Sequence, residues 1–390
     1  MKIFDSAILD LPFFNDEHRN LADKLEKWVF TNWERQDNDA EICPRVRGRH
    51  YTKLLGKEGW FNDIIGEKIN KRPDLRSICL IREAFSYLDD LIDFAFSIQT
   101  LSSAAIDWFG SAAQREIYIP KARSGDIIGA FSLSEPEVGS DISAISCKAT
   151  SVPTGFRIEG SKSWISNGDI ADFCCVLVRT GEGPSALGLS LFVLPLSDCS
   201  NNTISRFPVD FIAHRACANF EFNGHLANVS SIIGEAGLGF GYAMDVLNFY
   251  RVSVGAAAIG FSRRAQHAAL QWCKRRQVVG GTLLHTQLSQ SKFSEIELQL
   301  HSSALLVARA AWEYDVGSCG GSPRNSAMAK LHATESAQHI VDEALQLLGA
   351  IGLTEKSITA KLYRQVRSLR IYEGTSEIQR MIIAKGMKID

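Results

Sequence analysis

The spacing of apolar residues changes twice along the chain, and this order limits the possible folds. Over residues 15–123, apolar side chains recur every three or four positions, as at Phe85, Leu88 and Leu91, which is typical of helices. Over residues 125–234, short β-rich runs alternate with Gly, Pro, Asn and Asp, which is typical of short strands. Helical spacing then returns. Few folds place a block of strands between two helical regions.

This order predicts a multidomain α+β fold. We expect an all-helical N-terminal domain at 1–126, an antiparallel β-sandwich or barrel domain at 127–233, and a four-helix-bundle domain at 234–390. Within the last domain we expect helices at 239–278, 286–316 and 325–348 and a short final helix after Gly374. The glycines at 280–281, 317 and 349 are typical of helix ends.

Composition excludes several classes of function. The 390 residues include 42 basic and 44 acidic side chains, a net charge of -2, so no overall field attracts nucleic acid or an anionic membrane. The sequence contains no stretch of about 18 uncharged apolar residues, so we expect no membrane span. Nine cysteines, none in a C-x-x-C pair, cannot form a closed set of disulfides. We expect a cytoplasmic protein without nucleic-acid or membrane partners.

The first motif is LSEPEVGSD, residues 133–141, at the exit of a predicted strand. Gly139 and Ser140 are small enough for their backbone N–H groups to approach an anion such as a pyrophosphate. An ordinary turn explains the same residues. The motif alone therefore favours a turn over a phosphate site.

The second motif is KSWISNG, residues 162–168. Trp164 offers a flat apolar face and Ser166 a hydrogen-bonding hydroxyl, a combination that could cover and bond the edge of a flavin ring. A core tryptophan followed by a surface hairpin is the alternative. Taken alone, the motif fits that alternative better.

The third motif is RIYEGTSEIQR, residues 370–380, at the entrance to the last helix. Glu373 precedes Gly374, so its carboxylate could approach a ligand with little steric hindrance. In an apolar cleft its pKa would rise towards the working pH, as a general base requires. A solvated glutamate in a loop is the alternative.

Two further patterns have simple explanations. Arg275 and Arg276 complement the dipole at the end of a long helix, although an arginine could also clamp a phosphate. His332, Glu335 and His339 have helical spacing but match no familiar zinc pattern, so we expect no metal.

Together, the order and separation of the three motifs resemble those of the acyl-CoA dehydrogenase family over nearly the whole chain. LSEPEVGSD is similar to the first signature of that family, WISNG to its flavin-edge motif, and YEGTSEIQR to the signature that carries its catalytic glutamate. The resemblance implies a helix–sheet–helix fold with Glu373 as the catalytic base. A second base position of some branches, just before Arg251, is occupied here by Tyr250.

The resemblance also implies which residues bind the ligands. The expected FAD-binding residues are Phe131, Leu133, Ser134, Gly139, Ser140, Trp164, Ile165, Ser166, Arg276, Gln287, Gln346, Gly349, Ala350, Thr375 and Glu377. The set from Arg276 to Ala350 matches positions that reach the FAD of a neighbouring subunit. The expected substrate-binding residues are Ser140, Asn248, Arg251, Tyr372 and Gly374.

The function implied by the resemblance is FAD-dependent α,β-dehydrogenation of an acyl-CoA to a trans-2-enoyl-CoA. The implied partners are an electron-transfer flavoprotein and further copies of the chain, in a tetramer or a dimer. Two alternatives stay open: a dehydrogenase or oxidase that acts on an acyl or aminoacyl group tethered to a carrier protein, and a flavin-binding, nucleic-acid-associated stress protein. The balanced charge disfavours the last. The length and branching of the acyl group are left open.

Overall fold

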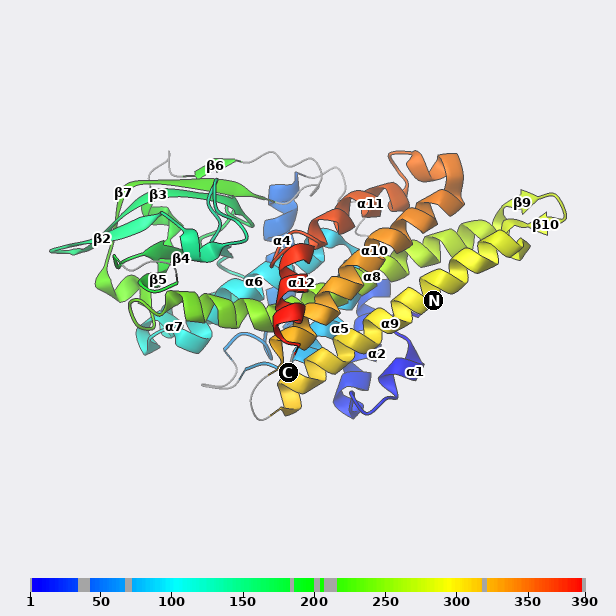
Figure 1. The fold of residues 1–390 in the computed structure, drawn as a ribbon, viewed down its shortest axis with the longest axis horizontal. Helices are drawn as coiled ribbons and strands as arrows, with labels where there is room; N and C mark the ends of the chain where they lie inside the picture. Colours follow the sequence, from blue (N-terminus) through cyan, green and yellow to red (C-terminus); the bar gives the residue numbers. More distant parts are fainter. Residues whose placement is uncertain are drawn as a thin grey trace.

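The structure is a computed structural model that describes residues 2–33, 43–66, 72–182, 186–199, 204–206, 216–317 and 321–387. A β-sheet lies at one end of the molecule, and long helices extend from it to the other end (Figure 1). The helix–sheet–helix order expected from the sequence is confirmed.

The N-terminal region is helical, as expected. Its described helices are α1 (Ser6–Leu9), α2 (Asp16–Thr31), α4 (Pro44–Lys57), α5 (Leu75–Leu88), α6 (Asp90–Phe109) and α7 (Ala112–Arg123). Capping boxes at Asn15 and Ser111 satisfy free N–H groups at the starts of α2 and α7. Almost every residue of α5 and α6 is buried, so these two helices lie inside the protein rather than on its surface.

The strands of the middle region form one mixed sheet in the order β6-β7-β3-β2-β4-β5-β8. They are β1 (Gly129–Ser132), β2 (Lys148–Val152), β3 (Gly155–Ile165), β4 (Phe173–Arg179), β5 (Leu189–Pro195), β6 (Ile204–Arg206), β7 (Ala218–Ala227) and β8 (Ile232–Ile233). The expected antiparallel pairing holds for most neighbours. However, β1 and β2 both run parallel to β4. They share one edge of β4 because a long loop, and not a tight turn, joins them.

The C-terminal region contains the three long helices expected and two shorter ones. They are α8 (Gly239–Arg275), α9 (Gln287–Val316), α10 (Pro323–Leu348), α11 (Ile358–Leu369) and α12 (Ser376–Lys385). The sequence did not predict α11. It also placed the end of α8 at Val278, three residues too late, because the chain leaves the helix to form the hairpin of β9 (Gln277–Val278) and β10 (Gly281–Thr282).

The two helical regions share one hydrophobic core, in which α8 is central. Its residues 249–262 are buried, and α5, α6, α9 and α10 all contribute to the same cluster. An added Cβ at Gly260 would lie 2.1 Å from the carbonyl oxygen of Glu83, so only glycine allows α8 to approach α5 this closely. In the described part of the chain, no helix combines the length and apolar character needed to cross a membrane.

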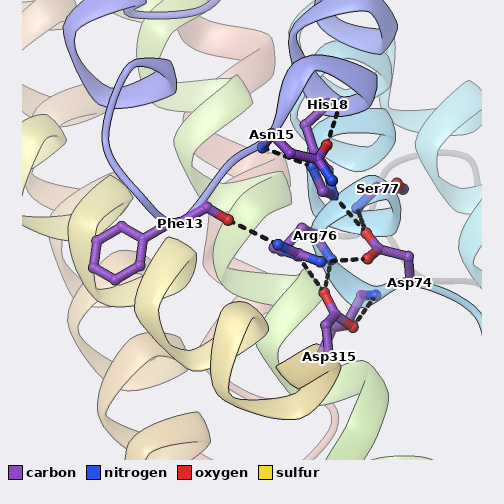
Figure 2. A network of polar contacts seen from close by, with 8 residues as sticks. Phe13, Asn15, His18, Asp74, Arg76, Ser77 and Asp315 are labelled. Atoms are coloured by element: carbon purple, nitrogen blue, oxygen red, sulfur yellow. Dashed lines mark hydrogen bonds and ion pairs between the residues drawn. The ribbon is translucent and has the colours of Figure 1, made fainter. Parts of the chain in front are cut away.

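A network of charged groups ties the N-terminal segment to α5 and α9 (Figure 2). Arg76 is at its centre: Nε lies 2.7 Å from Asp315 Oδ2, and Nη2 lies 2.9 Å from Asp74 Oδ2. Arg76 Nη1 also donates to the carbonyl oxygen of Phe13 at 3.0 Å, and His18 Nε2 lies 2.9 Å from Asp74 Oδ1. One guanidinium therefore joins three segments that are distant in sequence.

We expect Arg76→Met to lower the free energy of unfolding by about 3 kcal/mol, because it leaves the nearly buried Asp315 carboxylate without its cation. Urea unfolding would measure the loss. The control is Arg49→Met, which removes an exposed ion pair with Asp172 and should cost less than about 1 kcal/mol. Equal losses in the two variants would contradict the importance of the network.

Candidate functional site

Glu373 lies in the short connection between α11 and α12, in a backbone conformation that is rare for its residue type. Its φ is 52°, and Gly374 follows with a φ of 89°. Thr375 caps α12 by accepting a hydrogen bond from the Ile378 N–H. The Glu373 carboxyl oxygen Oε2 is buried and has no hydrogen-bond partner among the described residues. A buried carboxylate oxygen is thus left available for a ligand.

Three side chains hold this connection by its backbone carbonyls. Lys330 Nζ donates to the carbonyl oxygens of Tyr372 at 3.1 Å and Gly374 at 2.7 Å. Arg251 Nε donates to the carbonyl oxygen of Glu373 at 3.4 Å. The side-chain amide of Gln379 donates to the carbonyls of Glu373 and Gly374 at 3.3 and 2.9 Å. The carbonyls of residues 372–374 all have donors, although they lie outside any helix.

Opposing effects act on the pKa of Glu373. Burial raises it above its ordinary value of 4.5, and this is the largest effect. The cations Arg82, Lys330 and Arg251 act in the other direction, and the net pKa stays raised. Burial also lowers the pKa of Lys330, to about 8. The carboxyl group is a stronger base than an exposed glutamate, and the nearby cations still favour its ionised form.

Arg82 supplies the charge that acts most strongly on Glu373. It is fully buried on α5 and pairs with Asp93 of α6 through two hydrogen bonds of 2.9 and 2.8 Å. Its Nη1 donates to Ser253 Oγ of α8 at 3.0 Å. Although burial opposes the charge, Asp93 keeps the pKa of Arg82 above its ordinary value. The guanidinium is therefore a permanent cation in the interior.

Tyr250 directly precedes Arg251, at the position for which the sequence resemblance implied a second base in some branches. Its ring is buried and stacks against Trp108, with centroids 6.3 Å apart and an interplanar angle of 15°. Burial raises the pKa of its hydroxyl, so the phenol stays protonated at neutral pH. Asn248 accepts a 2.6 Å hydrogen bond from Arg251 Nη1. Tyr250 therefore does not add a second base, and Asn248 helps to hold the guanidinium of Arg251 in place.

The loop after β1 is organised around a buried ion pair. Lys162 Nζ lies 3.0 Å from Glu135 Oε1 and donates to the Leu133 carbonyl at 2.9 Å. Glu135 also accepts hydrogen bonds from the backbone N–H groups of Ser146 and Cys147 at 2.7 and 2.9 Å. Burial lowers the pKa of Lys162, while Glu135 opposes that effect. The ion pair joins both ends of the loop to β3.

The residues expected to line FAD in this region are partly open. Trp164 has a φ of 63° and is 53% exposed, which disagrees with a core tryptophan. An added Cβ at Gly139 would meet no neighbouring group within 4 Å, and Ser140 is exposed. Phe131, Ser134 and Ser166 are half-buried, whereas Leu133 and Ile165 are buried. The Ile165 side chain packs in the sheet core, so only its backbone is available to a ligand.

A second set of expected FAD-binding residues lies elsewhere in the fold. Arg276 directly follows α8 and Gln287 begins α9, beside the β9–β10 hairpin and at the opposite end of the molecule from the sheet (Figure 1). The other members of this set are at the end of α10, namely Gln346, Gly349 and Ala350. All five are exposed. Within one chain, Arg276 and Gln287 do not meet Gly139 and Trp164. Near Glu373, Thr375 is half-buried and Glu377 is exposed.

Sequence reasoning missed several charged residues of the site. Arg82 interrupts the apolar run of α5, and Lys330 sits among alanines on α10. A charge inside an apolar helical stretch was the available signal. Glu335, considered as a metal ligand, instead accepts a hydrogen bond from Ser376 and pairs with Arg370 at 2.8 Å. In the part of the chain that the structure describes, no group of His, Cys, Asp or Glu could hold a metal ion.

Family models match two parts of the chain. Residues 130–223 match the acyl-CoA dehydrogenase middle domain, and residues 237–388 match the acyl-CoA dehydrogenase C-terminal domain. These ranges contain the loop after β1, Trp164, Arg251, Lys330 and Glu373.

Individual proteins and structures are also similar. Human mitochondrial short-chain specific acyl-CoA dehydrogenase is 34% identical over 278 residues, which cover 71% of this chain and 66% of the human protein. The 3-(aryl)acrylate reductase of Clostridium sporogenes is 30% identical, and the match covers 96% of this chain and 99% of the reductase. The crystal structure of glutaryl-CoA dehydrogenase from Mycobacterium smegmatis has a TM-score of 0.86 and 25% identity, covering 98% of this chain and 97% of that chain.

We expect Glu373→Gln to stabilise the protein at pH 8 relative to the wild type. The raised pKa of Glu373 means that the folded state holds this proton more tightly than the unfolded state does. The wild type therefore loses stability as the pH rises through that pKa, and the amide does not. Thermal unfolding at several pH values would test this. A gain that did not shrink towards pH 4 would contradict it.

Proposed function

The chain belongs to the acyl-CoA dehydrogenase family, and we propose that it oxidises the Cα–Cβ bond of an acyl-CoA to give a trans-2-enoyl-CoA, with Glu373 as the base. We propose that the protein is a flavoprotein oxidoreductase with FAD as its cofactor, as its family membership implies. One observation carries the proposal: the half-buried Glu373 has a raised pKa and a buried carboxyl oxygen, Oε2, without a hydrogen-bond partner among the described residues, and it lies in a loop held by three side chains.

The residues around the loop after β1 are compatible with FAD. Trp164 presents an exposed ring where a core tryptophan would be covered, and Gly139 leaves an open space beside the loop. We propose that Leu133, Ser134 and Ser140 bind the cofactor there, together with Trp164 and Ser166. When bound, FAD supplies the acceptor for the hydride that leaves the substrate's β-carbon.

In the proposed reaction, Glu373 removes the proton from the substrate's α-carbon. An α-proton beside a thioester is too weakly acidic for an ordinary carboxylate, so the base must be desolvated and the developing negative charge must be stabilised. Burial supplies the first requirement, and the raised pKa of Glu373 is its result. For the second, we propose that the backbone N–H of Glu373 donates to the thioester carbonyl. Arg251 keeps the loop in place through the Glu373 carbonyl.

We further propose that copies of this chain complete one another's cofactor sites. Arg276 and Gln287 are exposed at the end of the helical region that is remote from the sheet (Figure 1). Their side chains offer a cation and an amide that could bind FAD on a second subunit. An electron-transfer flavoprotein is the proposed electron acceptor.

A second candidate is the reverse direction, reduction of a 2-enoyl substrate. The observation that favours it is the near full-length similarity to the C. sporogenes 3-(aryl)acrylate reductase. The direction is tested by comparing two reactions: oxidation of the reduced flavoprotein by enoyl thioesters, and bleaching of the oxidised flavin by saturated thioesters. Bleaching by CoA thioesters, compared with bleaching by carrier-protein thioesters, identifies the thioester carrier.

We expect Glu373→Gln to abolish flavin bleaching by acyl-CoA in stopped-flow experiments while the FAD content stays normal, because an amide cannot accept the α-proton. The control is Glu116→Gln, an exposed glutamate of α7, which should bleach at the wild-type rate. Wild-type bleaching by the Glu373 variant would overturn the assignment of the base.

We expect Gly139→Ala to weaken FAD binding about tenfold or more, because the new methyl group would occupy space proposed for the cofactor. The fold of the Gly139→Ala variant should be little affected, since no neighbouring group lies within 4 Å of the new Cβ. Gly241→Ala, where the added Cβ is equally free of neighbours, is the control and should keep its FAD. Titration of apoprotein with FAD measures both. Equal affinities in the two variants would argue against FAD beside Gly139.

A further inference from the structure

We propose that Lys330 is a positioning residue for the base: its ammonium group ties together the two carbonyls that flank Glu373 and so holds the carboxyl group in its reactive place. The inference rests on the proposed function of Glu373. It adds a role for a side chain of α10, a helix that does not itself carry the base.

Lys330 spans both sides of Glu373. Its Nζ donates to the Tyr372 carbonyl at 3.1 Å and to the Gly374 carbonyl at 2.7 Å. Of the three carbonyls, Arg251 bonds that of Glu373, at 3.4 Å, and Gln379 bonds those of Glu373 and Gly374. Of these three side chains, Lys330 is the one that bonds a carbonyl on each side of Glu373, in addition to the backbone hydrogen bonds of Tyr372 and Ser376.

The backbone at Glu373 needs such a restraint. A glutamate with a φ of 52° is in the left-handed region, which is strained for residues other than glycine. Such a conformation persists only where the surroundings hold it. Without the Lys330 hydrogen bonds, we expect the peptide groups on either side of Glu373 to rotate and the carboxyl group to move.

The position of Lys330 is itself costly, which argues that it has a function. The residue is fully buried, and both hydrogen bonds go to neutral carbonyls and not to a carboxylate. Burying an ammonium group without a directly paired anion is unfavourable. The nearby Glu373 carboxylate favours the charged form of Lys330, while burial opposes it.

The test compares Lys330→Met with the wild type and with Lys24→Met, which removes a lysine over the Trp60 ring in the N-terminal region. In FAD-loaded Lys330→Met, we expect flavin bleaching by acyl-CoA to slow about 100-fold, the effect that a displacement of the base by about 1 Å can have. The substrate concentration for half-maximal rate should change little. Lys24→Met should bleach at the wild-type rate.

A second readout does not depend on activity. Amide hydrogen exchange in the peptide 370–379 should rise at least about tenfold in Lys330→Met, with the sheet and α8 unchanged. In Lys330→Ala, propylammonium should restore part of the bleaching rate, because it can replace the missing stem and its charge. Propan-1-ol should restore none. The Ala variant also serves if the Met variant does not fold.

The outcomes separate the two claims. If the wild type bleaches, Glu373→Gln does not, and Lys330→Met bleaches at the wild-type rate, the role of Lys330 is overturned and the proposed function stands. Exchange that rises throughout the variant, together with no rescue by propylammonium, would show a purely structural lysine and also overturn the inference. If wild-type holoprotein is not bleached by any acyl thioester, both claims fall.

Discussion

The hydrogen bonds to the carbonyls of residues 372–374 support the strained backbone that positions Glu373 with one carboxyl oxygen buried. They come from Arg251 on α8, Lys330 on α10 and Gln379 on α12, so the loop is fixed only when three helices pack together. Gly260 contributes indirectly, because the close contact it allows between α8 and α5 sets the depth of α8 in the core. The packing of the helical regions therefore determines the position of one carboxyl group.

The charges around Glu373 favour the ionised form of its carboxyl group, although burial raises its pKa. Burial makes the carboxylate a stronger base but also favours its protonated, inactive form. Arg82, Lys330 and Arg251 counter the second effect without direct ion pairs to the carboxyl group that would block it. Arg82 is suited to this role because Asp93 and Ser253 hold it rigidly and keep it charged. A mobile surface lysine would be screened by water and could not have the same effect.

Much of the fold was predictable because long helices and glycine stops leave clear patterns, as for α8, α9 and α10. The short α11 was missed, and so was the parallel pairing of β1 with β4, which depends on contacts between segments distant in sequence. Glu373 could be named from its motif. Arg82 and Lys330 could not, because a charge in an apolar helix shows only that some partner exists, and the partner is identified by packing.

The residues proposed to bind the cofactor lie at two opposite ends of the molecule. The open space at Gly139 and the exposed Trp164 belong to the sheet end, where the ion pair of Lys162 and Glu135 ties the loop to β3. Arg276 and Gln287 are at the far end, so they cannot complete that site in the same chain. Their exposure makes sense if a second copy brings them to the sheet. Assembly would then be coupled to cofactor binding, because each proposed site would take contacts from two subunits.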